Sequence, residues 1–258
     1  MSLTIAAVCV TLTACGDDAG SSATSTRTAT PQTTTSLSAQ PVSPTTTASS
    51  APGPAVTVGA VPGNPNAATA LTPWVRDLVA GDIDQLVRKC WTIEPTNARN
   101  MYADQPGILD AVAQPGLDGQ FAVIWKGATR TVSVKRSEIA SGYACPRVSP
   151  ADDPAAFNTA DARYAVHRYL SRWIGKPVDP NDAEGKYPLV CAGSTLANNP
   201  GKLTGTTGFK DSDITVQSAG PDQVEVSVPL TNSSGVTQPA TFVLNIGQEG
   251  YCITDIRS

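Results

Sequence analysis

The chain has 258 residues, and its 18 Lys and Arg against 22 Asp and Glu give a formal net charge of −4 at pH 7. The basic residues are not clustered, which excludes a nucleic-acid partner, because binding to a phosphate backbone needs a concentrated positive surface. Six cysteines without CxxC spacing and the single His167 do not make a zinc site. We therefore expect no metal and no cofactor.

The N-terminal segment has the pattern of a lipoprotein export signal. Residues 3–12 are mostly apolar, Thr13 and Ala14 are small, and Cys15 follows, as in a secretory signal. The LTAC sequence that ends at Cys15 resembles the lipobox of bacterial lipoproteins, although no Lys or Arg precedes it. The resemblance implies a signal peptide over 1–14 and lipidation of Cys15. It also implies that acyl chains hold the protein to the membrane, on the outer face of the cytoplasmic membrane.

The next segment is rich in Ser, Thr, Ala and Pro. Between residues 21 and 50 all but five residues are of these four types, and such a chain cannot bury enough apolar surface to offset the entropy lost on folding. We expect a disordered tether over 15–70, which begins at the lipidated Cys15. This composition, with Arg more frequent than Lys, is similar to that of actinobacterial envelope lipoproteins.

Residues 71–148 are expected to form an α+β block of helices followed by a small antiparallel sheet. Helices are predicted to begin at three positions with capping or helix-starting residues: Thr72, Asp82 and Gln105. Alternating apolar residues over 121–135 predict a β-hairpin. A further short strand is expected to carry Tyr143 and Cys145.

Residues 155–258 are expected to form a second α+β block. Asn158 or Thr159 caps a long helix, and apolar residues at helical spacing give it one buried face: Ala162, Ala165, Val166, Tyr169, Leu170, Trp173 and Ile174. Four strands are predicted after it. This order, with a last strand that reads Tyr251-x-Ile253-x-Asp255-Ile256, resembles the nuclear transport factor-like cone fold and implies a cone-like block.

Four cysteines lie beyond the predicted signal and lipidation site: Cys90, Cys145, Cys191 and Cys252. An even number in an exported chain predicts two disulfides. Three pairings are possible, and we favour Cys90–Cys145 with Cys191–Cys252 because each bond then lies within one block. The predicted fold class is thus α+β, with helices packed on antiparallel sheets in two small disulfide-stapled blocks.

Few side chains suggest a ligand site. Arg163, Arg168 and Arg172 lie on the predicted long helix as a possible anion-binding face or as an ordinary solvated face. The acidic run over 179–184 lacks the Gly and Glu of a calcium loop and is expected to form a capped turn. Four tryptophans are candidates for a pocket or for the core: Trp74, Trp91, Trp125 and Trp173.

The chain shows no catalytic signature. No G-x-S-x-G or phosphate-binding loop occurs, and cone-fold enzymes usually place an Asp/His or Asp/Tyr pair inside the cone, whereas His167 lies beside arginines. We expect a non-catalytic, membrane-anchored binding or adaptor module of the cell envelope. Its partner would be an envelope protein or an apolar envelope molecule. Two alternatives stay open: a structural or stress-buffering protein without a small ligand, and a cone-fold enzyme that uses Asp and Tyr.

Overall fold

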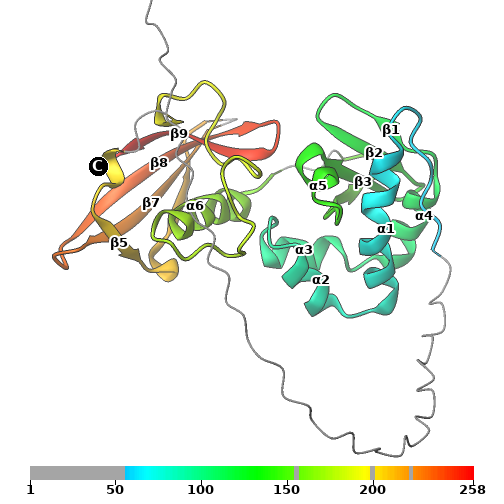
Figure 1. The fold of residues 1–258 in the computed structure, drawn as a ribbon, viewed down its shortest axis with the longest axis horizontal. Coiled ribbons are helices and arrows are strands. Elements are labelled where there is room, and N and C mark those ends of the chain that lie inside the picture. The colour runs from blue at the N-terminus through cyan, green and yellow to red at the C-terminus, as the bar shows by residue number, and fades with distance from the viewer. Residues whose placement is uncertain (1–55, 154–156, 198–200, 221–222) are drawn as a thin grey trace, which may run out of the picture. The chain divides into compact units, whose positions relative to one another are not determined.

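The computed structural model describes residues 56–153, 157–197, 201–220 and 223–258 (Figure 1). The predicted signal peptide, Cys15 and the tether up to residue 55 lie outside these residues. The described chain is α+β, with helices and antiparallel sheets in two blocks that belong to one compact unit. We call residues 56–153 the first block and the residues from 157 onward the second block. No described helix is both long enough and apolar enough to cross a membrane.

The first block begins earlier than expected. Helix α1 (Pro65–Ala80) starts seven residues before the predicted Thr72, with Pro65 in its first turn. The prediction of a tether as far as residue 70 was therefore wrong. Ala67 and Ala70 are buried, because small side chains on one face of a helix allow close packing even in an Ala-rich segment.

The residues before α1 also belong to the core. Val61 is buried, and the amide of Gly59 donates to the carbonyl of Val112 at 2.7 Å. The Gly59 carbonyl accepts a 3.0 Å hydrogen bond from the indole of Trp125. Backbone groups that are taken out of water need such partners, and the core supplies them here.

Three short helices follow, two of them as predicted. Helix α2 (Ile83–Lys89) is capped by Asp82, which accepts from the amide of Gln85 at 2.9 Å. Helix α4 (Gln105–Ala113) is capped by the side chain of Asp104. Helix α3 (Pro95–Met101), capped by Glu94, was not predicted because its sequence is largely polar and Ala98 is its one buried residue.

The first sheet has strand order β1-β2-β3-β4. The predicted hairpin is confirmed as β2 (Ala122–Lys126) and β3 (Arg130–Lys135), flanked by β1 (Leu117–Asp118) and β4 (Arg147–Pro150). The sheet carries buried Val123, Trp125, Val132 and Val134 against the helices.

The prediction of a strand at Tyr143 and Cys145 was wrong, because β4 begins only at Arg147. An unpredicted helix, α5 (Arg136–Ser141), ends at Gly142 with φ 81°. The backbone amides after Gly142 donate hydrogen bonds outside the sheet. The amide of Ala144 donates to the carbonyl of Ala70 at 2.9 Å, and the amide of Cys145 donates to the carboxylate of Glu138 at 3.1 Å. These amides are therefore not available to a strand ladder.

The second block is built from α6 (Thr159–Trp173) and a sheet that it packs against. Asn158 caps the helix and forms a capping box with Asp161. The predicted meander is confirmed: β6 (Thr215–Ser218), β7 (Gln223–Asn232), β8 (Thr237–Gly247) and β9 (Gly250–Arg257). Figure 1 shows β7, β8 and β9 side by side. An additional β5 (Thr206–Phe209) pairs with β7, as β6 also does. The helix stripe and the inner sheet residues form a second core.

Both predicted disulfides are present. Cys90, at the end of α2, is bonded to Cys145, with Cα atoms 5.4 Å apart. Cys191 is bonded to Cys252 of β9, with Cα atoms 4.9 Å apart. Each bond lies within one block, as the favoured pairing requires.

Candidate functional site

The three arginines of α6 do not form an anion-binding site. Arg168 and Arg172 both bind Asp182, whose carboxylate is fully buried, and the Arg168 contact is 2.6 Å long. Arg172 also binds Glu184 at 2.7 Å. The acidic run that contains Asp182 folds onto α6 and supplies the negative charge that an anionic ligand was expected to supply.

Arg163 is neutralised separately, by Asp211 at 2.6 Å. The prediction of an anion-binding arginine face was therefore wrong, and so was the solvated alternative, since Arg168 is buried. The acidic run itself forms the expected turn, with the amide of Asn181 donating to Asp179 at 2.8 Å. Among the described residues no cluster of His, Cys, Asp and Glu could hold a metal ion.

His167 is part of the same surface network. Its Nδ1 lies 2.8 Å from the Oδ1 of Asp211, and its ring stacks on Tyr164 and meets Phe209 edge-on. Burial raises the pKa of Asp211, but the hydrogen bond from Arg163 and the nearby His167 outweigh it, and the pKa is lowered. Neither His167 nor Asp211 lines the cavity described below.

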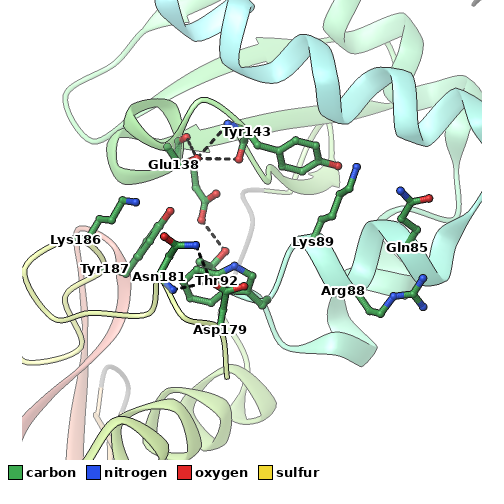
Figure 2. Close-up of a pocket in the computed structure, with 12 residues that line it drawn as sticks. Gln85, Arg88, Lys89, Thr92, Glu138, Tyr143, Asp179, Asn181, Lys186 and Tyr187 are labelled. Atoms are coloured by element: carbon green, nitrogen blue, oxygen red, sulfur yellow. Dashed lines mark hydrogen bonds between the residues drawn. The ribbon is translucent and has the colours of Figure 1, made fainter. Parts of the chain in front are cut away.

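A cavity lies between α2 and α5 of the first block and the 179–187 segment of the second (Figure 2). Its volume is about 620 Å³, within the range of small-molecule sites. Its lining is formed by twelve residues: Gln85, Arg88, Lys89, Trp91, Thr92, Glu138, Ser141, Tyr143, Asp179, Asn181, Lys186 and Tyr187.

Glu138 is the buried acid of this cavity. It is 4% exposed, and its two oxygens accept from the hydroxyl of Thr92 at 2.6 Å and the amide of Cys145 at 3.1 Å. Burial raises the pKa of Glu138, against the opposing effect of the Thr92 hydrogen bond and the charge of Lys135. The carboxyl group is thus held rigidly by the loop that carries the first disulfide.

A second polar cluster joins Tyr143 and Lys89 through Asp77. The Tyr143 hydroxyl and the Lys89 ammonium each donate to Oδ2 of Asp77 at 2.6 Å, and the ammonium also lies 5.1 Å from the centre of the Tyr143 ring. Burial raises the pKa of Tyr143, and the bond to Asp77 adds to the rise. Burial raises the pKa of Asp77 as well, but its two hydrogen bonds lower it more. The cluster fixes the Tyr143 ring at the cavity wall.

Trp91 and Tyr187 meet across the two blocks. Their rings make an edge-to-face contact at 4.9 Å, and the guanidinium of Arg168 lies 5.0 Å from the Trp91 ring centre. The hydroxyl of Tyr164 donates to the carbonyl of Trp91 at 2.7 Å. These contacts hold one wall of the cavity from both sides.

Further polar contacts tie the blocks together beside the cavity. Arg147 of β4 donates to both oxygens of Asp161 at 3.1 Å, and both residues are buried. Ser137 donates to Glu249 at 2.6 Å. Together these contacts fix the position of one block against the other, so the cavity has a defined shape.

Of the four candidate tryptophans, Trp91 lines the cavity, whereas Trp74 and Trp125 are fully buried and Trp173 is partly buried. Nothing in the sequence groups Glu138 or Tyr187 with Trp91. Glu138 lies in a short helix and Tyr187 in an irregular segment, and neither has a hydrophobic period that predicts its structure. Comparison with protein-family models, with curated proteins and with solved structures found no match.

Proposed function

We propose that this chain is a non-catalytic binding module of the cell envelope, and that it takes its ligand in the cavity between the two blocks. The observation that carries the proposal is the cavity itself: about 620 Å³, walled by aromatic rings and polar groups on supports held by a disulfide and hydrogen bonds. Ligand sites favour such preformed clefts between packed units, with a few convergent polar groups.

Two cavity side chains with acid or base chemistry, Glu138 and Tyr143, have fixed positions. Both Glu138 oxygens already accept hydrogen bonds, and the Tyr143 hydroxyl already donates to Asp77. These hydrogen bonds hold the Glu138 and Tyr143 side chains in place, which suits fixed contacts to a bound ligand.

The lipobox-like segment and the two disulfides support an extracytoplasmic place for this module. Disulfides persist in oxidising compartments, and acylation of Cys15 would hold the module at the outer face of the cytoplasmic membrane. The order of α6 and the following meander also supports a cone-like second block, in which the sheet curves around the helix.

Native mass spectrometry of the full chain, purified from the membranes of a host that processes lipoproteins, tests the proposal. We expect extra mass that leaves on denaturation. Gln85→Trp should abolish it, because the indole fills the cavity while the backbone amide of residue 85 still donates to the capping Asp82. Arg76→Trp places the same side chain at an exposed position of α1 and should keep the extra mass. A wild-type spectrum without any releasable mass contradicts a small-molecule binder and favours a structural protein.

A further inference from the structure

We infer that the cavity binds a saccharide that carries a carboxylate or phosphate group. This inference rests on the proposed binding function and specifies the ligand of the same site. It replaces the apolar envelope molecule that we expected from the sequence.

The first argument is the chemistry of the lining. None of the twelve lining residues is aliphatic, and nine of them carry a charge or a hydroxyl group, with two amides and one indole making up the rest. An acyl chain there would take the side-chain amide of Gln85 and the charge of Arg88 out of water without a hydrogen-bond partner, which costs free energy for each group. The site instead suits a ligand with many hydroxyl groups.

The second argument is the combination of rings and amides. The rings of Tyr143 and Tyr187 line the cavity from different blocks, with the amides of Gln85 and Asn181 among the other lining groups (Figure 2). A sugar ring has one face of C–H groups and a rim of hydroxyls, so it can pack on an aromatic ring and bond to amides at once. Aromatic side chains contribute both area and fixed geometry to such contacts.

The third argument is the charge available at the rim. Arg88 and Lys186 are exposed, come from opposite sides of the cavity, and have no ion-pair partner among the described residues (Figure 2). Lys89, in contrast, forms an ion pair with Asp77. Of the lining acids, Glu138 is buried and doubly hydrogen-bonded. Asp179 accepts hydrogen bonds from Asn181 and keeps its negative charge.

Arg88 and Lys186 thus outnumber Asp179 among the lining charges without an ion-pair partner, so the rim has an excess of positive charge, although the whole chain has a net charge of −4. Charge-assisted hydrogen bonds to Arg and Lys are the strong ones for carboxylates and phosphates. An anionic ligand would supply the ion-pair partners that Arg88 and Lys186 lack among the described residues.

An apolar ligand has a better site elsewhere in the second block. A cavity of about 510 Å³ beside the second disulfide is lined largely by apolar groups, among them Trp173, Val190 and Leu196. Substitutions at Arg88 and Lys186 do not touch it. The two kinds of ligand can therefore be separated by mutation.

The test titrates the full chain with three probes by isothermal calorimetry: glucuronic acid, glucose 6-phosphate and glucose. We expect at least one of the two acids to bind about tenfold or more tightly than glucose, as a single charged contact allows. Tighter binding of glucuronic acid indicates a carboxylate ligand, and tighter binding of glucose 6-phosphate indicates a phosphate ligand. Arg88→Gln and Lys186→Gln should each weaken its binding by about tenfold. Arg76→Gln and Lys126→Gln, at exposed positions outside the cavity, should leave it unchanged.

The composition of the mass released in native mass spectrometry separates the two proposals. A released molecule that fragments with loss of a uronic acid or sugar phosphate supports both. A released molecule without an acidic sugar, kept by Arg88→Gln and Lys186→Gln, overturns the ligand class and leaves the binding function standing. Equal affinity for glucose and both acids also overturns the class. No released mass together with no binding of any probe overturns both proposals.

Discussion

Glu138 shows how one buried group can connect stability to the candidate site. Its side chain is held by Thr92 and by the backbone of Cys145, so it supports the loop of the first disulfide and also lines the cavity. Because burial raises its pKa above the ordinary value of 4.5, the folded protein keeps this proton to a higher pH than the unfolded chain does.

The sign of the resulting pH dependence follows from proton linkage. Well below pH 4.5 both states are protonated and Glu138 contributes no penalty. As the pH rises above 4.5 the unfolded chain loses the proton first, so the free energy of unfolding falls until the folded-state pKa is passed. Glu138→Gln should remove this decline, and its stability relative to wild type should rise with pH in urea unfolding from pH 4 to 8.

Thr92→Val provides a second variant for the same group. It removes the hydrogen bond that lowers the pKa of Glu138, so the decline of stability should extend to a higher pH than in wild type. Parallel curves for wild type, Glu138→Gln and Thr92→Val would show that the Glu138 proton is not linked to folding.

At the scale of the element, the segment before α1 decides where the folded region begins. A Cβ atom placed on Gly59 would lie 1.7 Å from the carbonyl oxygen of Gln114, whereas one placed on Gly185 meets nothing within 4 Å. Gly59→Ala should therefore lower the free energy of unfolding by about 1–3 kcal/mol or more, the usual cost of overpacking.

Gly185→Ala is the matched control and should change stability by less than about 0.5 kcal/mol. Thermal and urea unfolding of the two variants check the prediction. If Gly59→Ala is as stable as Gly185→Ala, the segment before α1 is not part of the core.

The elements that the sequence predicted are those with a cap and a clear period. Asp82 and Asn158 each mark a helix start, and the alternation along β7 and β8 identifies the meander. Helices α3 and α5 are as short as α2 but bury only Ala98 and Glu138, so they have no apolar face from which a helical period could be recognised. The start of α1 was missed because its Ala and Pro residues have the composition of a tether.

The candidate site was less predictable because tertiary packing assembles it. Arg168 and Asp182 both look like surface charges in the sequence, and only the fold pairs and buries them. A usable signal was the acidic run shortly after an arginine-bearing helix, since opposite charges at that spacing can meet when the chain turns back. No comparable signal pointed to Glu138 or Tyr187.

At the scale of the whole molecule, each disulfide closes a long loop. Cys191 and Cys252 are 61 residues apart, and removing a native disulfide from a small domain typically costs about 2–5 kcal/mol. Cys252→Ser should lower the melting temperature and expose one reactive thiol at Cys191 on unfolding. Cys191→Ser combined with Cys252→Ser should lose similar stability without a new thiol. Unchanged melting of both variants would contradict a stabilising role for this bond.

The proposed lipid anchor would determine where the whole molecule acts, and Cys15 is its only expected attachment point. Two acyl chains hold a protein stably at a membrane, whereas one holds it weakly. Cys15→Ala should therefore release the protein to the medium or leave it with an uncleaved signal peptide, as membrane fractionation and intact mass would show. Cys9→Ala changes another cysteine, inside the predicted signal, and should leave processing and retention intact. If Cys15→Ala were retained and processed like wild type, Cys15 would not be the lipidation site, and the module would need another means of reaching the envelope.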